Sequence, residues 1–149
     1  MNNTKAWHQL FETGNLKDLE ALLAKDAVFY SPLVFKPQPG RKLTAMYLKN
    51  AYEMFFADGN ESFKYVREIH SDTDSMLEFT CEIDGILING IDVIKWNEEG
   101  KIQEFKVFIR PNKAIEKVKE KMSELLAKLS TMDKLKLKAS MVMDGLKTN

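Results

Sequence analysis

The chain has 149 residues, of which 44% are hydrophobic and 30% are charged, a balance typical of one globular domain and unlike that of a disordered protein. Its 22 basic and 22 acidic residues cancel, and the one cysteine, Cys81, excludes an intrachain disulfide. The sequence begins without an apolar targeting segment and contains no long uncharged apolar run, which predicts a cytoplasmic protein without a membrane partner.

Basic residues concentrate toward the C-terminus. Residues 111–149 hold 9 basic and 5 acidic residues, whereas residues 1–110 hold 13 and 17. Lys117 and Lys121 alternate with Glu120 and Glu124 at helical spacing, which is typical of a solvated helix face. We therefore expect no nucleic-acid partner.

Two short helices are predicted at the start of the chain. The first has Thr4 as a candidate N-cap and ends at Gly14. Asn15 then caps the second. The apolar stripes of the two helices are Trp7, Leu10 and Phe11, and Leu16, Leu19, Leu22 and Leu23.

A strand and a third helix follow. Residues 27–31, Ala-Val-Phe-Tyr-Ser, favour a strand that Pro32 stops. Residues 36–40 are rich in proline and glycine and predict a loop. The third helix is predicted from about Leu43 to Ala57, and Asp58-Gly59-Asn60 ends it.

The spacing then changes to period two, which predicts antiparallel strands. A first strand starts with Phe63, Tyr65 and Ile69. Residues 77–83 then alternate between apolar and polar side chains. Asp84-Gly85 predicts a hairpin turn. One face of the next strand is expected to carry Ile86, Ile88, Gly90, Asp92, Ile94 and Trp96.

The last predicted strand follows a turn at residues 97–100. We expect Gln103, Phe105, Val107 and Ile109 to share its inner face, with Ile102 and Phe108 on the outer face. A partner on the outer face would explain why both faces are apolar.

Pro111 starts a final helix, with an apolar stripe that runs from Ile115 to Leu129. A weaker stripe continues it through Leu135, Ala139, Val142, Met143 and Leu146. We expect a domain of residues 1–125 and a helical extension of residues 126–149. The tail methionines are compatible with a tail over a pocket mouth, across a dimer partner, or exposed to solvent; they are Met122, Met132, Met141 and Met143.

Helices followed by antiparallel strands predict an α+β domain. Four segments resemble the nuclear transport factor 2-like superfamily, in particular its SnoaL-like branch: residues 7–23, residues 26–32 with Gly40-Arg41, residues 90–111, and the helix after Pro111. The resemblance implies a cone-shaped α+β barrel. In it, three N-terminal helices pack on a curved, mostly antiparallel sheet with an extended C-terminal helix.

Ketosteroid isomerases share this architecture and allow a comparison residue by residue. The resemblance places their oxyanion-hole aspartic acid on Asp92, their general base on Ser31 and their oxyanion-hole tyrosine on Trp7. A serine is no base by itself, and an indole N–H is a weaker acid than a phenol. We therefore do not expect standard ketosteroid isomerase activity.

Asp92 is the residue most indicative of a site. Burial on an apolar face raises the pKa of a carboxyl group, and the neutral acid can donate a hydrogen bond to a ligand carbonyl. The alternative is that Asp92 is bonded to a neighbour such as Tyr30, Trp7 or a loop N–H. One of four tyrosines facing Asp92 would replace the donor lost at Trp7; these are Tyr30, Tyr47, Tyr52 and Tyr65.

Two functions remain open. The first is a pocket for a small apolar molecule, with isomerase, cyclase or dehydratase chemistry if the protein is an enzyme and Asp92 as the acid. The second is a non-catalytic dimeric interaction module whose outer sheet face carries Leu87, Ile91, Val93 and Phe108. We expect a homodimer and no cofactor. We also expect no metal, because His8 and His70 have no neighbouring ligand pattern. The predicted pocket walls are Trp7, Tyr30, Ser31, Phe55, Phe79, Ile94, Trp96, Phe105, Val107 and Ile109.

Overall fold

The computed structural model of the chain describes residues 1–128, 134–135 and 138–139, and it confirms the α+β class. Short 3-10 turns at Leu16–Asp18 and Ala57–Gly59 flank two of the helices. The helices and strands are α1 (Thr4–Thr13), α2 (Leu19–Leu22), β1 (Leu23–Tyr30), β2 (Gln38–Pro39), α3 (Arg41–Phe55), β3 (Lys64–His70), β4 (Asp74–Ile83), β5 (Ile86–Trp96), β6 (Ile102–Arg110) and α4 (Asn112–Ala127).

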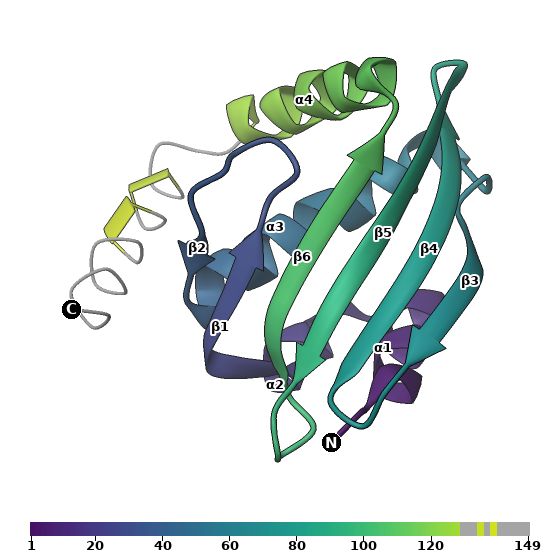
Figure 1. The fold of residues 1–149 in the computed structure, drawn as a ribbon. Coiled ribbons are helices and arrows are strands. Elements are labelled where there is room, and N and C mark those ends of the chain that lie inside the picture. The colour runs from purple at the N-terminus through teal and green to yellow at the C-terminus, as the bar shows by residue number, and fades with distance from the viewer. Residues whose placement is uncertain (129–133, 136–137, 140–149) are drawn as a thin grey trace.

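The strands form one curved, unclosed sheet in the order β2-β1-β6-β5-β4-β3. β1 runs parallel to β6, and the other neighbouring strands are antiparallel. The helices α1, α2 and α3 lie on one face of the sheet, and α4 lies across one end, beyond the end of β6 (Figure 1). The core lies between that face and the helices.

Alternation along β4 and β5 gives the sheet a buried inner face, as predicted. In β5 the buried positions recur at Ile88, Gly90, Asp92, Ile94 and Trp96. Residues paired across antiparallel strands share a face. Asp92 pairs with Leu77 of β4 and Val107 of β6, so it lies in the middle of the inner face rather than at an edge.

The predicted hairpin joins β4 to β5. Ile83 pairs with Ile86, and the two residues between them have positive φ angles, 50° at Asp84 and 77° at Gly85. Two central residues with positive φ form the turn whose twist matches that of paired strands. This turn sets the register that places Asp92 on the inner face.

The first strand begins earlier than predicted. α2 ends at Leu22, and Leu23, predicted to belong to the helix, opens β1 by pairing with Ile102 of β6. Leucine is compatible with either structure, so pairing with a distant strand decides the boundary. The N-cap prediction was also wrong: Thr4 is the first residue of α1, and its N–H donates to Asn2 Oδ1 at 3.0 Å.

The last strand contains a bulge that the alternation did not predict. Lys95 pairs with Glu104 while Trp96 pairs with Ile102, which leaves Gln103 between them. Ile102 is therefore fully buried on the inner face, whereas it was predicted outside. The side chain of Gln103, predicted inside, donates from Nε2 to Asp26 Oδ1 at 3.1 Å.

Two further boundaries differ from the prediction. The segment 36–40, expected to be a loop, contains the short strand β2, whose Pro39 pairs with Val28. α3 spans Arg41–Phe55 and not Leu43–Ala57. Gly40, with φ of 106°, links β2 directly to α3 and accounts for the earlier start of the helix.

The C-terminal predictions are covered only in part. α4 extends to Ala127, so the expected domain boundary after residue 125 falls within its last turn. Leu129, Met132, Val142 and Leu146, with Met141 and Met143, lie outside the described residues. The division into a domain and an extension stays a prediction.

Gly90 offers a test of this packing. A Cβ atom there would meet the ring of Phe79 and would lie 2.7 Å from the backbone oxygen of Phe108. Gly90→Ala should therefore lower the free energy of unfolding by about 1–3 kcal/mol in urea titrations. Lys95→Ala, on an exposed position of the same strand, should change it by less than about 0.5 kcal/mol. Equal stability of the Gly90 variant and the wild type would contradict the inner-face packing.

Candidate functional site

A cavity of about 450 Å³ lies between the inner face of the sheet and the helices α1, α3 and α4. A cavity of this size and apolar character is typical of small-molecule sites. It is lined by Trp7, Phe11, Phe29, Ser31, Pro32, Leu33, Val34, Tyr47, Leu48, Ala51, Tyr52, Met54, Phe55, Phe63, Asp92, Phe105, Val107, Ile109, Ile115, Val118, Lys119, Met122, Ser123 and Leu126.

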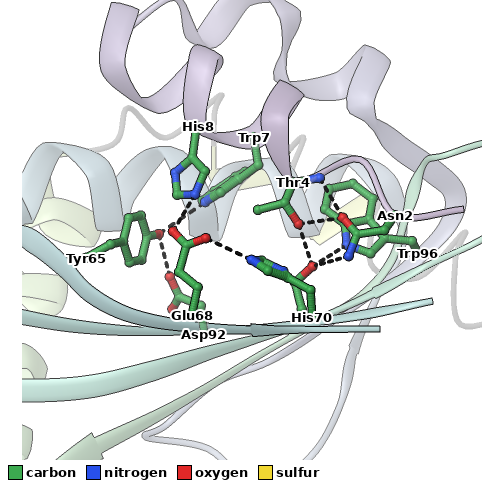
Figure 2. Close-up of polar contacts among 10 residues, drawn as sticks. Asn2, Thr4, Trp7, His8, Tyr65, Glu68, His70, Asp92 and Trp96 are labelled. Atoms are coloured by element: carbon green, nitrogen blue, oxygen red, sulfur yellow. Dashed lines mark hydrogen bonds and ion pairs between the residues drawn. The ribbon is translucent and has the colours of Figure 1, made fainter. Parts of the chain in front are cut away.

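Asp92 is the only carboxyl group among the described residues that line the cavity. The residue is 7% exposed. Tyr65 Oη donates to Asp92 Oδ2 at 2.8 Å, and Trp7 Nε1 donates to Tyr65 Oη at 3.1 Å. Figure 2 shows this chain of three side chains, which joins α1 to β3 and β5. Asp92 Oδ1 accepts no hydrogen bond from the part of the chain that the structure describes.

The surroundings of Asp92 favour its neutral form. Burial raises the pKa of its carboxyl group to about 7, and the hydrogen bond from Tyr65 offsets part of that rise. Burial and the charge of Asp92 in turn raise the pKa of Tyr65 well above its ordinary value, so Tyr65 remains a donor. Asp92 can therefore exchange a proton near neutral pH.

The sequence analysis left the hydrogen-bond partner of Asp92 undecided, and the structure shows that it is Tyr65. The expected neighbours were Tyr30, Trp7 or a loop N–H, whereas the structure places Tyr65 there, one of the four tyrosines considered. Trp7 acts one step further away, through Tyr65. Tyr65 lies on β3, which the sequence predicted, but its facing Asp92 depends on the register shift that follows it in that strand.

Several predicted wall residues lie around the cavity. Ser31 lies at the loop that follows β1, and its Oγ accepts the N–H of Leu33 at 3.0 Å. Its hydroxyl thus serves the turn at the end of the strand that Pro32 was predicted to stop. The other predicted residues that line the cavity are Trp7, Phe55, Asp92, Phe105, Val107 and Ile109.

Four predicted wall residues do not line the cavity. Tyr30 lies half-buried beside Lys106, whose Nζ is 4.5 Å from its ring centroid. Phe79 and Ile94 are fully buried in the packed core. Trp96 is held away from the cavity because its Nε1 donates to Ser75 Oγ at 2.9 Å.

The sequence did not single out most of the wall that α3, α4 and the loop after β1 supply. Each helix was predicted to have an apolar stripe, but a stripe does not reveal whether it covers a core or a cavity. Phe11 follows Trp7 at helical spacing and was the clearest available signal. The aromatic rings Phe29 and Tyr47 stack with centroids 4.9 Å apart and form the floor near β1.

The two histidines, far apart in the sequence, converge outside the cavity. His8 Nε2 lies 2.6 Å from Glu68 Oε1, and His70 Nε2 lies 2.9 Å from Glu68 Oε2 (Figure 2). The rings of His8 and Tyr65 also meet in a T-shaped arrangement, with centroids 5.4 Å apart. These contacts join α1 to β3 behind the Tyr65–Asp92 hydrogen bond.

Two further findings concern the described residues. Within residues 1–128, 134–135 and 138–139, no group of three or more His, Cys, Asp or Glu side chains is arranged to hold a metal ion. None of the helices in that part of the chain is long and apolar enough to cross a membrane.

The fold is similar to solved structures of other proteins. One, from Pseudomonas aeruginosa and named a steroid delta-isomerase, has a TM-score of 0.77 and 32% identity over 83% of this chain and 88% of that chain. Another, from Silicibacter pomeroyi DSS-3 and described as an uncharacterized protein with a cystatin-like fold, has a TM-score of 0.76 and 28% identity over 89% of both chains. The epoxide hydrolase/cyclase-like enzyme SalBIII is 14% identical, with a TM-score of 0.57 over 72% of this chain and 87% of its own, which shows the fold alone.

Among curated proteins, no sequence matches this chain. The family model of the SnoaL-like domain matches residues 4–105, which include Trp7, Tyr65 and Asp92. This match agrees with the curved sheet and with the resemblance predicted from the sequence. The chain belongs to the SnoaL-like domain family of the nuclear transport factor 2-like superfamily.

Proposed function

We propose that the protein binds a small apolar molecule with a carbonyl group, and that Asp92 donates a hydrogen bond to that carbonyl. The observation that carries this proposal is a single buried carboxyl group in an apolar cavity of about 450 Å³. Apolar walls supply affinity by excluding water, and one polar group fixes the orientation of the ligand.

The hydrogen bond from Tyr65 supports this role for Asp92. Because Tyr65 Oη already donates to Oδ2, the acidic proton of neutral Asp92 belongs on Oδ1. Oδ1 has no partner among the described residues, and Asp92 lines the cavity. A ligand carbonyl would accept this proton's hydrogen bond and satisfy a group that burial otherwise leaves unpaired.

If the protein is an enzyme, the supported class is proton transfer on an apolar carbonyl compound, as in isomerisation, cyclisation or dehydration. The protein from P. aeruginosa that this chain resembles is named a steroid delta-isomerase. A pKa of about 7 suits a group that gives and takes a proton at neutral pH. No second carboxyl lines the cavity in the described chain, and Ser31 lacks a base, so Asp92 would serve as both acid and base.

A second function is favoured by the outer face of the sheet. Leu87 is 71% exposed and Phe108 is 56% exposed, although both lie on central strands. Ile69, Met76 and Val93 pair across the same face and extend this apolar surface. We propose that a second copy of the chain covers it, since apolar patches on a sheet face are typical of dimer contacts.

Variants of Asp92 test the first proposal with a matched pair of ligands. 2-Acetylnaphthalene and 2-ethylnaphthalene differ by one carbonyl, and both should displace the fluorescent probe N-phenyl-1-naphthylamine. Asp92→Leu should weaken the ketone about five- to tenfold, because it removes one hydrogen bond, and should leave the hydrocarbon nearly unchanged.

Asp92→Asn is the control, because its N–H still donates but does not titrate. The wild type should lose affinity for the ketone as the pH rises through about 7, since the carboxylate cannot donate. The Asn variant should bind it equally between about pH 5 and pH 9. Equal ketone affinity in the wild type and Asp92→Leu would refute the role of Asp92.

The outer face is tested by sedimentation equilibrium. Leu87→Lys combined with Phe108→Lys should convert a dimer into a monomer, because it places charges in an apolar contact. Asp92→Leu, which lies on the opposite face, should leave the dimer intact. A wild-type protein that stays monomeric at about 100 µM would exclude this interface.

A further inference from the structure

The face of α4 that is turned to the cavity carries one charge. Six of its residues line the cavity at helical spacing, and five of them are apolar or small. The sixth is Lys119, an exposed lysine within the stripe. The full set is Ile115, Val118, Lys119, Met122, Ser123 and Leu126.

Lys119 differs from its neighbours in its partners. Lys117 pairs with Asp84 and Glu120, at 3.4 and 3.1 Å, and Lys121 pairs with Asp84 and Glu124, at 3.1 and 3.7 Å. Lys119 forms no ion pair with any described residue. The acidic residues thus pair with Lys117 and Lys121 near the β4–β5 turn. Lys119, which lines the cavity, has no counter-charge among the described residues, and neither has the exposed Lys113, which lies outside the cavity lining.

The two polar ends of the cavity are held by different parts of the fold. Asp92 is bonded by Tyr65 and, through it, by Trp7 of α1. Lys119 belongs to α4, and α1 and α4 lie at opposite ends of the sheet (Figure 1). A ligand that contacts Asp92 with a carbonyl group and fills the apolar space therefore reaches α4 with its other end.

We propose that the ligand of this cavity is an apolar carbonyl compound with an anionic group, such as a carboxylate, at its other end, and that Lys119 binds this group. This inference rests on the proposed function. Lys119 is exposed, so we expect its pairing with an anion to be modest and to weaken as salt is added. Ser123, one turn further along α4, also lines this end, but its hydroxyl donates to the backbone oxygen of Lys119 at 2.8 Å, so Lys119 is the group that would bind the anion.

Two probes that differ by one anionic group test this inference. They are N-phenyl-1-naphthylamine, which is neutral, and 8-anilino-1-naphthalenesulfonate, which carries a sulfonate on the same framework. Lys119→Met should weaken the anionic probe about fivefold, and Lys119→Glu should weaken it further, while the neutral probe binds as before. Lys113→Glu, an exposed change of equal charge on the same helix outside the cavity lining, should leave both affinities unchanged.

The outcomes separate this inference from the proposed function. Displacement of both probes by 2-acetylnaphthalene supports their binding in the cavity. If the Lys119 variants leave the ratio of the two affinities unchanged, Lys119 only covers the rim with its aliphatic stem, and the inference is overturned while the pocket stands. If the wild type binds neither probe, the proposed function fails and the inference fails with it.

Discussion

The hydrogen bond between Tyr65 and Asp92 is the interaction on which the site depends. A carboxyl group in the middle of an apolar sheet face loses the hydration that would stabilise its charge. Tyr65 compensates one oxygen, and Trp7 completes the hydrogen bonding of Tyr65. The other oxygen of Asp92 is left for the cavity. A buried polar atom without a hydrogen-bond partner lowers stability. Such atoms are therefore rare in the core and are typical of functional sites.

Hydrogen bonds also fix the two tryptophan side chains, which helps to keep the cavity open. The indole of Trp7 is directed to Tyr65, and the indole of Trp96 is directed to Ser75, which also contacts Thr4 and Asn2. Trp7 is thus fixed at the cavity wall by Tyr65, and Trp96 is fixed away from the cavity by Ser75. α4 then closes one end with flexible side chains such as Met122, which can adapt to a ligand.

Much of the fold was predictable from the sequence because period-two alternation and turn residues act locally. Asp84-Gly85 sets the register of β5, and that register placed Asp92 on the inner face. The start of β1 was not predictable, since Leu23 suits a helix or a strand and a distant strand decides. The bulge at Gln103 moved Ile102 from the predicted outer face to the inner face, and it too depends on the pairing with a neighbouring strand, here β5. The candidate site was predictable at Asp92, but the choice of Tyr65 over Tyr30 required the register of β3.

The most direct test is the apparent pKa of Asp92, measured by ¹³C NMR of labelled aspartate carboxyl groups and assigned with Asp92→Asn. A buried carboxyl facing an apolar cavity should titrate near pH 7, and 2-acetylnaphthalene should raise that pKa because the neutral acid donates to its carbonyl. A signal that titrates near pH 4, with or without the ketone, would show that Asp92 is a solvated carboxylate. The cavity would then lack the acid on which its proposed function rests.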